Sequence, residues 1–267
     1  MTDDSVYDEL GVPTVVNAAG TKTRIGGSRI RPGALDAMER AAESFVRLSD
    51  LQAAASDRIA AVTDADAGYV TNGAAGALVL SAAACIAGTD PGIMSRLPDT
   101  EGVADEIVMS RTHRTGYDHA LRAAGAEIVD IGSNDRYLGT GSRNVEPWEY
   151  ADAIGEDTAA VAHVYKGYEG PPLAGVCELA HDHDVPVIVD GGKSDTPVVE
   201  VTVDETAAGI STVELVRALR REEPRVFVGA DALDTHQFSV NPICLTDDEA
   251  DYVVGRIRAN LDGGSRE

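Results

Sequence analysis

Three lysines, Lys22, Lys166 and Lys193, occur among the 22 basic residues of this 267-residue chain. A lysine amine is the side chain that forms a Schiff base with a carbonyl group, so these three are the candidates for that chemistry. Lys193 follows two glycines in the segment DGGK, which is also the composition of an ordinary exposed loop. Both interpretations of Lys193 are open at this point.

The segment TNGAAG, residues 71–76, joins a short apolar run to a long Ala-rich stretch. At such a strand-to-helix turn, free backbone N–H groups and the helix dipole can hold a phosphate. The small residues Gly73, Ala74 and Ala75 would let an anion approach the backbone. Glycine and alanine at this place also serve tight packing alone, so the turn predicts either a phosphate site or close helix packing.

Two polar residues follow apolar runs that are typical of buried strands. His113 comes after EIVMS, and Asp190 ends VPVIVD. Both should lie at the carboxyl edge of a parallel sheet, where folds of this kind bind ligands. An imidazole there can stack on a flat ring or move a proton, and a carboxylate can pair with a protonated ring nitrogen. The structural alternative for each residue is a helix cap.

The cysteines give no metal site. Cys85, Cys177 and Cys244 lie far apart in apolar surroundings and show no CxxC spacing, which indicates buried reduced thiols. The remaining histidines show no ligand spacing and are His119, His163, His181, His183 and His236. We therefore expect no metal.

The formal net charge is −23. This acid excess argues against a nucleic-acid partner, because phosphate binding needs a clustered positive surface. Many acidic side chains, with arginine in place of lysine, keep a surface hydrated when salt screens repulsion, so we expect a halophilic protein; an acidic binding surface is the alternative.

The apolar stretch at residues 74–87 is too short to span a bilayer, and the start of the sequence lacks the regions of a signal peptide. These features predict a cytoplasmic protein with no membrane partner.

Apolar periodicity predicts the elements that must position these residues. Residues 35–48 and 51–62 have apolar side chains at helical spacing. From residue 67 onward, the runs GYVT, EIVMS, AEIVDIG, AVAHV and VPVIVD alternate with longer helical stretches, which is typical of an α/β fold with a parallel sheet. Beyond residue 190 the pattern changes to strand, helix, two strands and helix, which predicts a small α+β unit with an antiparallel sheet.

Several motifs occur together and in one order: VVNAAGTKTRIGGS, RLPDT, HRTGYDHALRAAGAEIVDIG and HDVPVIVD. Through them residues 7–190 resemble the selenocysteine synthase (L-seryl-tRNA selenium transferase) group of fold-type-I pyridoxal-phosphate enzymes, especially the branch that includes D-glucosaminate-6-phosphate ammonia-lyase. The resemblance implies a parallel-sheet transferase-like major domain. It also implies the cofactor pyridoxal 5'-phosphate.

The resemblance assigns roles to individual residues. It implies that Gly73, Ala74 and Ala75 bind the cofactor phosphate. It also implies that His113 stacks on the cofactor ring and that Asp190 pairs with the ring nitrogen. Arg24, in the family-like segment TRIGGS, would pair with a substrate carboxylate.

The sequence departs from the family after Asp190. Family members continue through further strands to an SGGK motif whose lysine forms the Schiff base, whereas here VIVD runs directly into GGK at residues 191–193. The sixth and seventh family strands lie between the fifth and the first, so VPVIVD is expected to pair with GYVTN in a truncated, five-stranded sheet. If GGK is the remnant of SGGK, Lys193 is the Schiff-base lysine. Three residues span at most about 10 Å, so Lys193 and Asp190 can reach one cofactor.

We therefore expect a pyridoxal-phosphate-dependent lyase or transferase that acts on an amino acid or amino sugar acid by aldimine formation, α-proton abstraction and elimination. The alternative is a catalytically impaired relic or a regulatory binding protein of the same family. The selenium-transfer reaction ranks below both, because the acidic surface should repel tRNA.

The expected parts of the chain are an N-terminal segment with helices at residues 1–66, a truncated cofactor-binding α/β domain at 67–193 and a small α+β domain at 194–267. The resemblance and the apolar helices between residues 35 and 62 predict a homodimer or a larger homo-oligomer.

Overall fold

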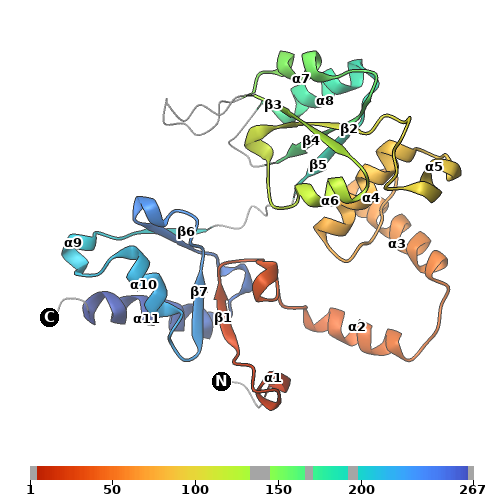
Figure 1. The fold of residues 1–267 in the computed structure, drawn as a ribbon. Helices are drawn as coiled ribbons and strands as arrows, with labels where there is room; N and C mark the ends of the chain where they lie inside the picture. Colours follow the sequence, from red (N-terminus) through yellow and green to blue (C-terminus); the bar gives the residue numbers. More distant parts are fainter. Residues whose placement is uncertain (1–4, 133–144, 166–170, 192–197, 264–267) are drawn as a thin grey trace. The chain divides into compact units, whose positions relative to one another are not determined.

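The computed structural model describes residues 5–132, 145–165, 171–191 and 198–263 (Figure 1). Contacts divide the chain into two compact units, one of residues 1–45 with 195–267 and one of residues 46–194. The first unit joins the two ends of the chain, because β1 (Val15–Ala18) pairs in parallel with β7 (Arg225–Val228). The strand at residues 15–18 thus belongs to the same compact unit as the C-terminal part of the chain.

The unit of residues 46–194 contains a four-stranded parallel sheet in the order β3-β2-β4-β5. Its strands are β2 (Glu106–Ser110), β3 (Glu127–Ile131), β4 (Thr158–Val164) and β5 (Val187–Asp190). The expected α/β class and the relative order of these four strands are confirmed. A parallel sheet of this kind brings the carboxyl ends of its strands to one edge.

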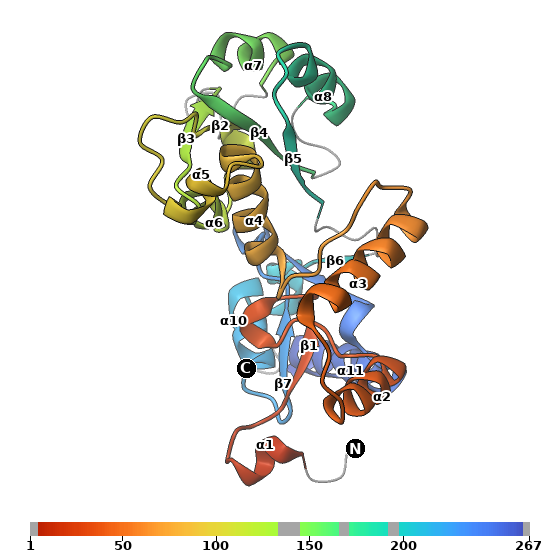
Figure 2. The ribbon, with the colours of Figure 1, turned by 90° about the vertical axis from the view of Figure 1, so that its right-hand side faces the viewer.

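Helices cover both faces of this sheet (Figure 2). Alternate residues of β2 point to opposite faces, so Ile107 packs with α4 (Ala74–Ala87) and α6 (Asp118–Ala123). Val108 packs on the other side with α7 (Pro147–Ala153) and α8 (Leu173–Asp182). Both side chains are fully buried, and each burial contributes roughly 1.5–3 kcal/mol.

The expected pairing of GYVTN with VPVIVD is wrong: within the described residues, β5 pairs with β4 alone and residues 68–71 form no strand. Side chains of α3 (Leu48–Thr63) bind this segment instead. The Gln52 amide donates to the carbonyl of Val70 at 3.0 Å and accepts from its N–H at 3.3 Å, and the Ser56 hydroxyl accepts from the N–H of Gly68 at 3.0 Å. These bonds satisfy backbone groups that a neighbouring strand would otherwise satisfy.

The other unit is a small α+β structure, as the C-terminal sequence pattern predicts. Beside the β1–β7 pair it has an antiparallel pair of β6 (Val199–Thr202) and β8 (Gln237–Val240). Side chains from α10 (Thr212–Leu219) and α11 (Asp247–Gly263) complete its core.

Both helices expected near the N-terminus are present. They are α2 (Pro32–Ala42), which begins with a proline at its first turn, and α3. No helix in the described ranges is long and apolar enough to cross a membrane.

Candidate functional site

Buried polar side chains gather at the carboxyl edge of the four-stranded sheet. Six polar or charged side chains are buried in the described parts of the chain, and four of them lie here: Ser110, His113, Asp118 and His163. Asp190 ends β5 at the same edge and lines a narrow cleft with Thr115, Tyr117, Asp118 and His163. The fold therefore brings the two residues expected at this edge, His113 and Asp190, into one region.

The start of α4 supplies a second feature of this unit. Gly73 caps the helix with φ 139° and ψ 177°, a conformation that glycine adopts far more readily than other residues. A Cβ built at Gly73 would meet nothing within 4 Å, so space is open before the first N–H groups. Those N–H groups have no partner inside a helix and can donate to an anion. At Gly76 a side chain would overlap Asn72, so this turn also needs glycine for packing.

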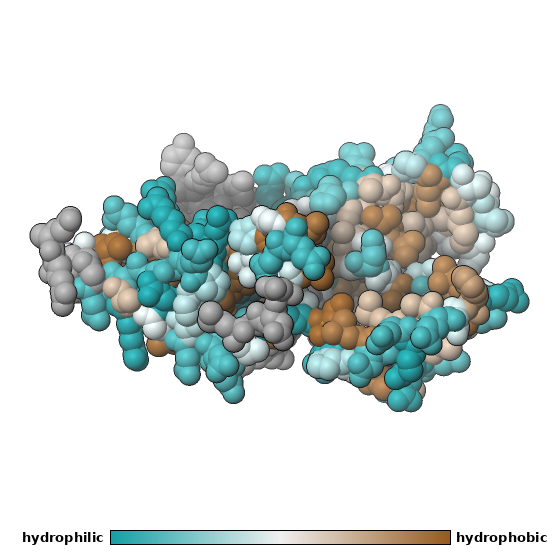
Figure 3. Space-filling view, turned by 90° about the horizontal axis from the view of Figure 1, so that it is seen from below, coloured by the Kyte–Doolittle hydropathy of each residue, from teal (hydrophilic) through white to brown (hydrophobic). Residues whose placement is uncertain are grey.

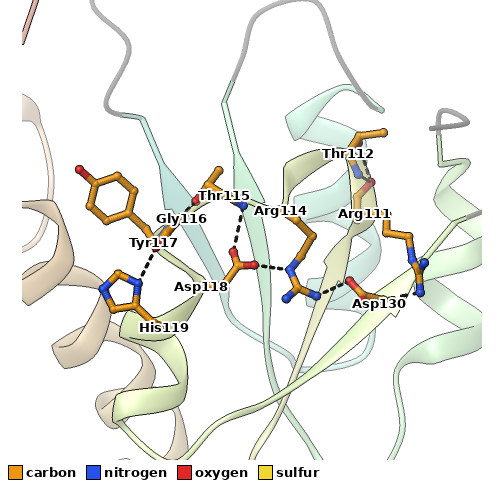
Figure 4. A network of polar contacts seen from close by, with 10 residues as sticks. Arg111, Thr112, Arg114, Thr115, Gly116, Tyr117, Asp118, His119 and Asp130 are labelled. Atoms are coloured by element: carbon orange, nitrogen blue, oxygen red, sulfur yellow. Dashed lines mark hydrogen bonds and ion pairs between the residues drawn. The ribbon is translucent and has the colours of Figure 1, made fainter. Parts of the chain in front are cut away.

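A chain of charged groups fixes the segment that follows His113 (Figure 4). Arg114 donates through Nε to Asp118 and through Nη1 to Asp130 on β3, the latter at 2.6 Å. Arg111 lies 3.7 Å from the same Asp130 carboxylate, and the N–H of Thr115 donates to Asp118 at 3.1 Å. Burial lowers the pKa of Arg114, but the hydrogen bonds to Asp118 and Asp130 outweigh it and raise that pKa above its ordinary value. The guanidinium therefore stays charged and holds the start of α6 against β3.

The rings of His113 and His163 are in contact. Their centroids are 4.4 Å apart and the planes meet at 76°, which is an edge-to-face arrangement. Burial, and then the nearby His113, lower the pKa of His163 to about 4, so His163 is neutral near pH 7. His163 was not singled out in the sequence because it lacks ligand spacing. The available signal was one polar residue near the carboxyl end of an otherwise apolar strand.

The remaining candidates belong to the other unit or fall outside the described residues. Lys193 and Lys166 are outside the described residues. Lys22 is in the other unit, 3.5 Å from Asp231, and Arg24 belongs to that unit as well, in the short 3₁₀ helix Thr23–Ile25. Arg114 and Asp118 were not predicted as part of the site, because their spacing of four residues is that of an ordinary helical ion pair.

The described residues fit a ligand that carries a phosphate and a flat, nitrogen-containing ring. The turn at Gly73 offers N–H donors and open space for the phosphate. Asp190 offers a carboxylate at the cleft, which suits a protonated ring nitrogen. Within the described residues no group of acidic, histidine or cysteine side chains could hold a metal ion.

Comparisons with known proteins point to one group. No protein-family model matches the chain. Over 201 residues it is 30% identical to D-glucosaminate-6-phosphate ammonia lyase of Salmonella typhimurium, covering 72% of this chain and 52% of that protein. Over 190 residues it is 33% identical to 5'-C-glycyluridine monooxygenase-decarboxylase of a Streptomyces species, covering 69% of this chain and 47% of that protein. The chain thus spans about half the length of these relatives.

A solved structure of D-glucosaminate-6-phosphate ammonia-lyase has the same fold. It superposes with a TM-score of 0.82 at 20% identity and covers 99% of this chain and 100% of the compared chain. At this level of identity the likeness concerns the fold.

Proposed function

Because the chain belongs to the D-glucosaminate-6-phosphate ammonia-lyase-like group of fold-type-I pyridoxal-phosphate proteins, we propose that it is a lyase or transferase acting on an amino acid or amino sugar acid. Pyridoxal 5'-phosphate is the cofactor that this membership implies. The observation that carries the proposal is the presence, in one compact unit, of the open turn at Gly73 and of Asp190 beside a cleft.

The residues of the site would divide the work as follows. The N–H groups of Gly73, Ala74 and Ala75 would bind the phosphate, and the dipole of α4 would strengthen that contact. Asp190 would favour a proton on the ring nitrogen by its negative charge. His113 would help to orient the ring. When bound, the cofactor supplies an electron sink for a carbanion next to the substrate amine.

Two roles remain proposals from the resemblance. Lys193 would carry the cofactor and move the substrate proton, because it ends the GGK segment that resembles the SGGK motif of the family. Arg24 would bind a substrate carboxylate through its planar guanidinium.

A second candidate is a catalytically impaired relic or a regulatory binder. Residues 68–71 are bound by α3 and do not join the sheet, so the described sheet ends at β5. A site that is preorganised for chemistry needs its anchors on one rigid framework. The two curated relatives also carry different reactions in their names, so family membership alone does not select one.

Spectroscopy separates the two candidates. Pyridoxal phosphate gains a visible absorbance band when a lysine amine condenses with it, so we expect this band on adding cofactor to the wild-type chain. Lys193→Ala should lose the band, whereas Lys22→Ala, which removes an exposed lysine paired with Asp231, should keep it. An equally strong band in Lys193→Ala would remove Lys193 from the mechanism. Absence of a band in all three proteins would favour the relic.

We also propose a homodimer or larger homo-oligomer that works in a salt-rich cytoplasm. No residue of α2 or α3 is buried, and hydrophobic patches interrupt the hydrophilic surface in Figure 3. The net charge of −23 supports the proposed salt-rich environment, and the three widely spaced cysteines support the proposed cytoplasmic location.

A further inference from the structure

Hydrogen bonds hold the residues on both sides of His113. Ser110 accepts from the N–H of Thr112 at 3.3 Å, and its hydroxyl lies 2.7 Å from the Thr112 hydroxyl. On the other side, Arg114 is held between Asp118 and Asp130. These bonds fix where the His113 side chain begins, whereas the plane of its ring depends on the side chains that touch the ring.

His163 is a side chain that touches this ring. It extends from β4 opposite Val189 of β5, so its backbone is part of the sheet. The residue is 3% exposed, which leaves its side chain little freedom to change rotamer. The edge-to-face contact at 4.4 Å therefore connects the rigid sheet directly to the His113 imidazole.

The chemistry of His163 suits such a contact. A neutral ring can lie against a second imidazole in either protonation state of that imidazole without repelling it, and burial keeps His163 neutral near pH 7. Its Nδ1 is buried and has no hydrogen-bond partner in the described parts of the chain. A side chain that only filled this part of the core would be more favourable if it were apolar.

We propose that His163 is a positioning residue that sets the plane of the His113 ring at the carboxyl edge of the sheet. Toward the cofactor, this role rests on the proposed function, because His113 is the residue proposed to lie against the cofactor ring. The contact between the two histidines itself is independent of that function.

The first test needs no cofactor. Diethyl pyrocarbonate modifies accessible imidazoles, and mass spectrometry of peptides follows His113 separately in the full chain. His163→Ala should let the buried His113 react several-fold faster, because the cavity allows its ring to open to solvent. His163→Phe keeps a ring at this position and should react at the wild-type rate.

Val161→Ala is the matched control. Val161 is fully buried on the same strand, two residues earlier, and packs in the core on the α7 and α8 side with an aliphatic side chain in place of a ring. It should leave the His113 rate unchanged. Equal acceleration in Val161→Ala, or an unchanged rate in His163→Ala, would overturn the proposal, since the first shows general loosening and the second shows that His163 does not restrain the ring.

The second test adds pyridoxal phosphate and measures visible circular dichroism per bound cofactor, which reports how uniformly the ring is held. We expect a loss of most of this signal in His163→Ala and its retention in His163→Phe and Val161→Ala. If the wild-type chain binds no cofactor, the proposed function fails while the His113 reaction rates still test the contact. If cofactor binds and His163→Ala keeps the full signal, the positioning role is wrong even though the proposed function stands.

Discussion

His163 is a single residue whose burial makes a prediction about stability and pH. Its pKa is about 4 in the folded chain and near 6.5 ordinarily, so below pH 6.5 the unfolded chain binds a proton that the folded chain does not. The free energy of unfolding should therefore fall as the pH drops from 6.5 to 4, by up to roughly 3 kcal/mol from this residue. His163→Phe removes this contribution, so the free energy of unfolding of the variant should rise relative to that of the wild type as the pH falls.

Urea unfolding at several pH values within this window measures the difference between the two proteins. Carboxyl groups that titrate in both proteins cancel in that difference. A difference that is constant across the window would show that His163 takes up a proton as readily in the folded chain as in the unfolded chain.

Tyr150 on α7 makes a second prediction at the residue scale. Its side chain is fully buried and its hydroxyl has no hydrogen-bond partner within the described residues; burial, and then Glu149, raise its pKa to about 12. Tyr150→Phe removes an unsatisfied hydroxyl and should leave the free energy of unfolding unchanged or raise it by about 1 kcal/mol. Tyr150→Ala should lower it by about 3–5 kcal/mol through the cavity. Denaturant unfolding checks both, and a clear loss in Tyr150→Phe would show that the hydroxyl is bonded.

At the scale of elements, Arg114 connects α6 to β3 through its bonds to Asp118 and Asp130, and the contribution of this connection to stability can be measured. Asp130 accepts from Arg114 and lies near Arg111, and its side chain is 27% exposed. Asp130→Asn removes the charge that both guanidinium groups face, so we expect a loss of about 1–2 kcal/mol in the free energy of unfolding. The control is Asp50→Asn, because the Arg47–Asp50 pair is largely exposed and should contribute less than about 1 kcal/mol. Equal losses in the two variants would show that the link adds no more than a surface pair.

At the same scale, the sequence predicts elements with a regular apolar pattern and misses those fixed by distant partners. The local apolar pattern predicts the strand EIVMS and the Ala-rich α4. It also predicts the strand VPVIVD, whose carboxyl end places Asp190 at the edge of the sheet. The segment GYVT has the composition of a strand, but composition does not determine whether a neighbouring strand is available to pair with it. Here the Gln52 amide binds the backbone of this segment instead. Likewise, Val15 of β1 pairs with Arg225 of β7, and no local pattern can predict a pairing between residues so far apart in the sequence. His163 was missed because its significance comes from the ring it touches.

For the whole molecule, the net charge of −23 predicts a dependence of stability on salt. At low ionic strength the acidic side chains repel one another, and salt shortens the reach of that repulsion from about 10 Å at 0.1 M to about 3 Å at 1 M. We expect the thermal unfolding midpoint to rise with KCl concentration over this range. A midpoint that is flat or falls with KCl would contradict the proposed halophilic character.

Assembly of whole chains should follow the same dependence. All residues of α3 are at least partly exposed, and Leu48, Leu51 and Val62 are more than half exposed, which is unusual for large apolar side chains on one helix. A second copy that covers this helix would bury them, provided that salt screens the repulsion between two chains of the same negative charge. Sedimentation should therefore show a dimer or larger species in molar KCl and dissociation at low salt. Leu51→Lys should weaken the assembly, whereas Val254→Lys, on the exposed side of α11, should not. A compact monomer in molar KCl would rule the assembly out.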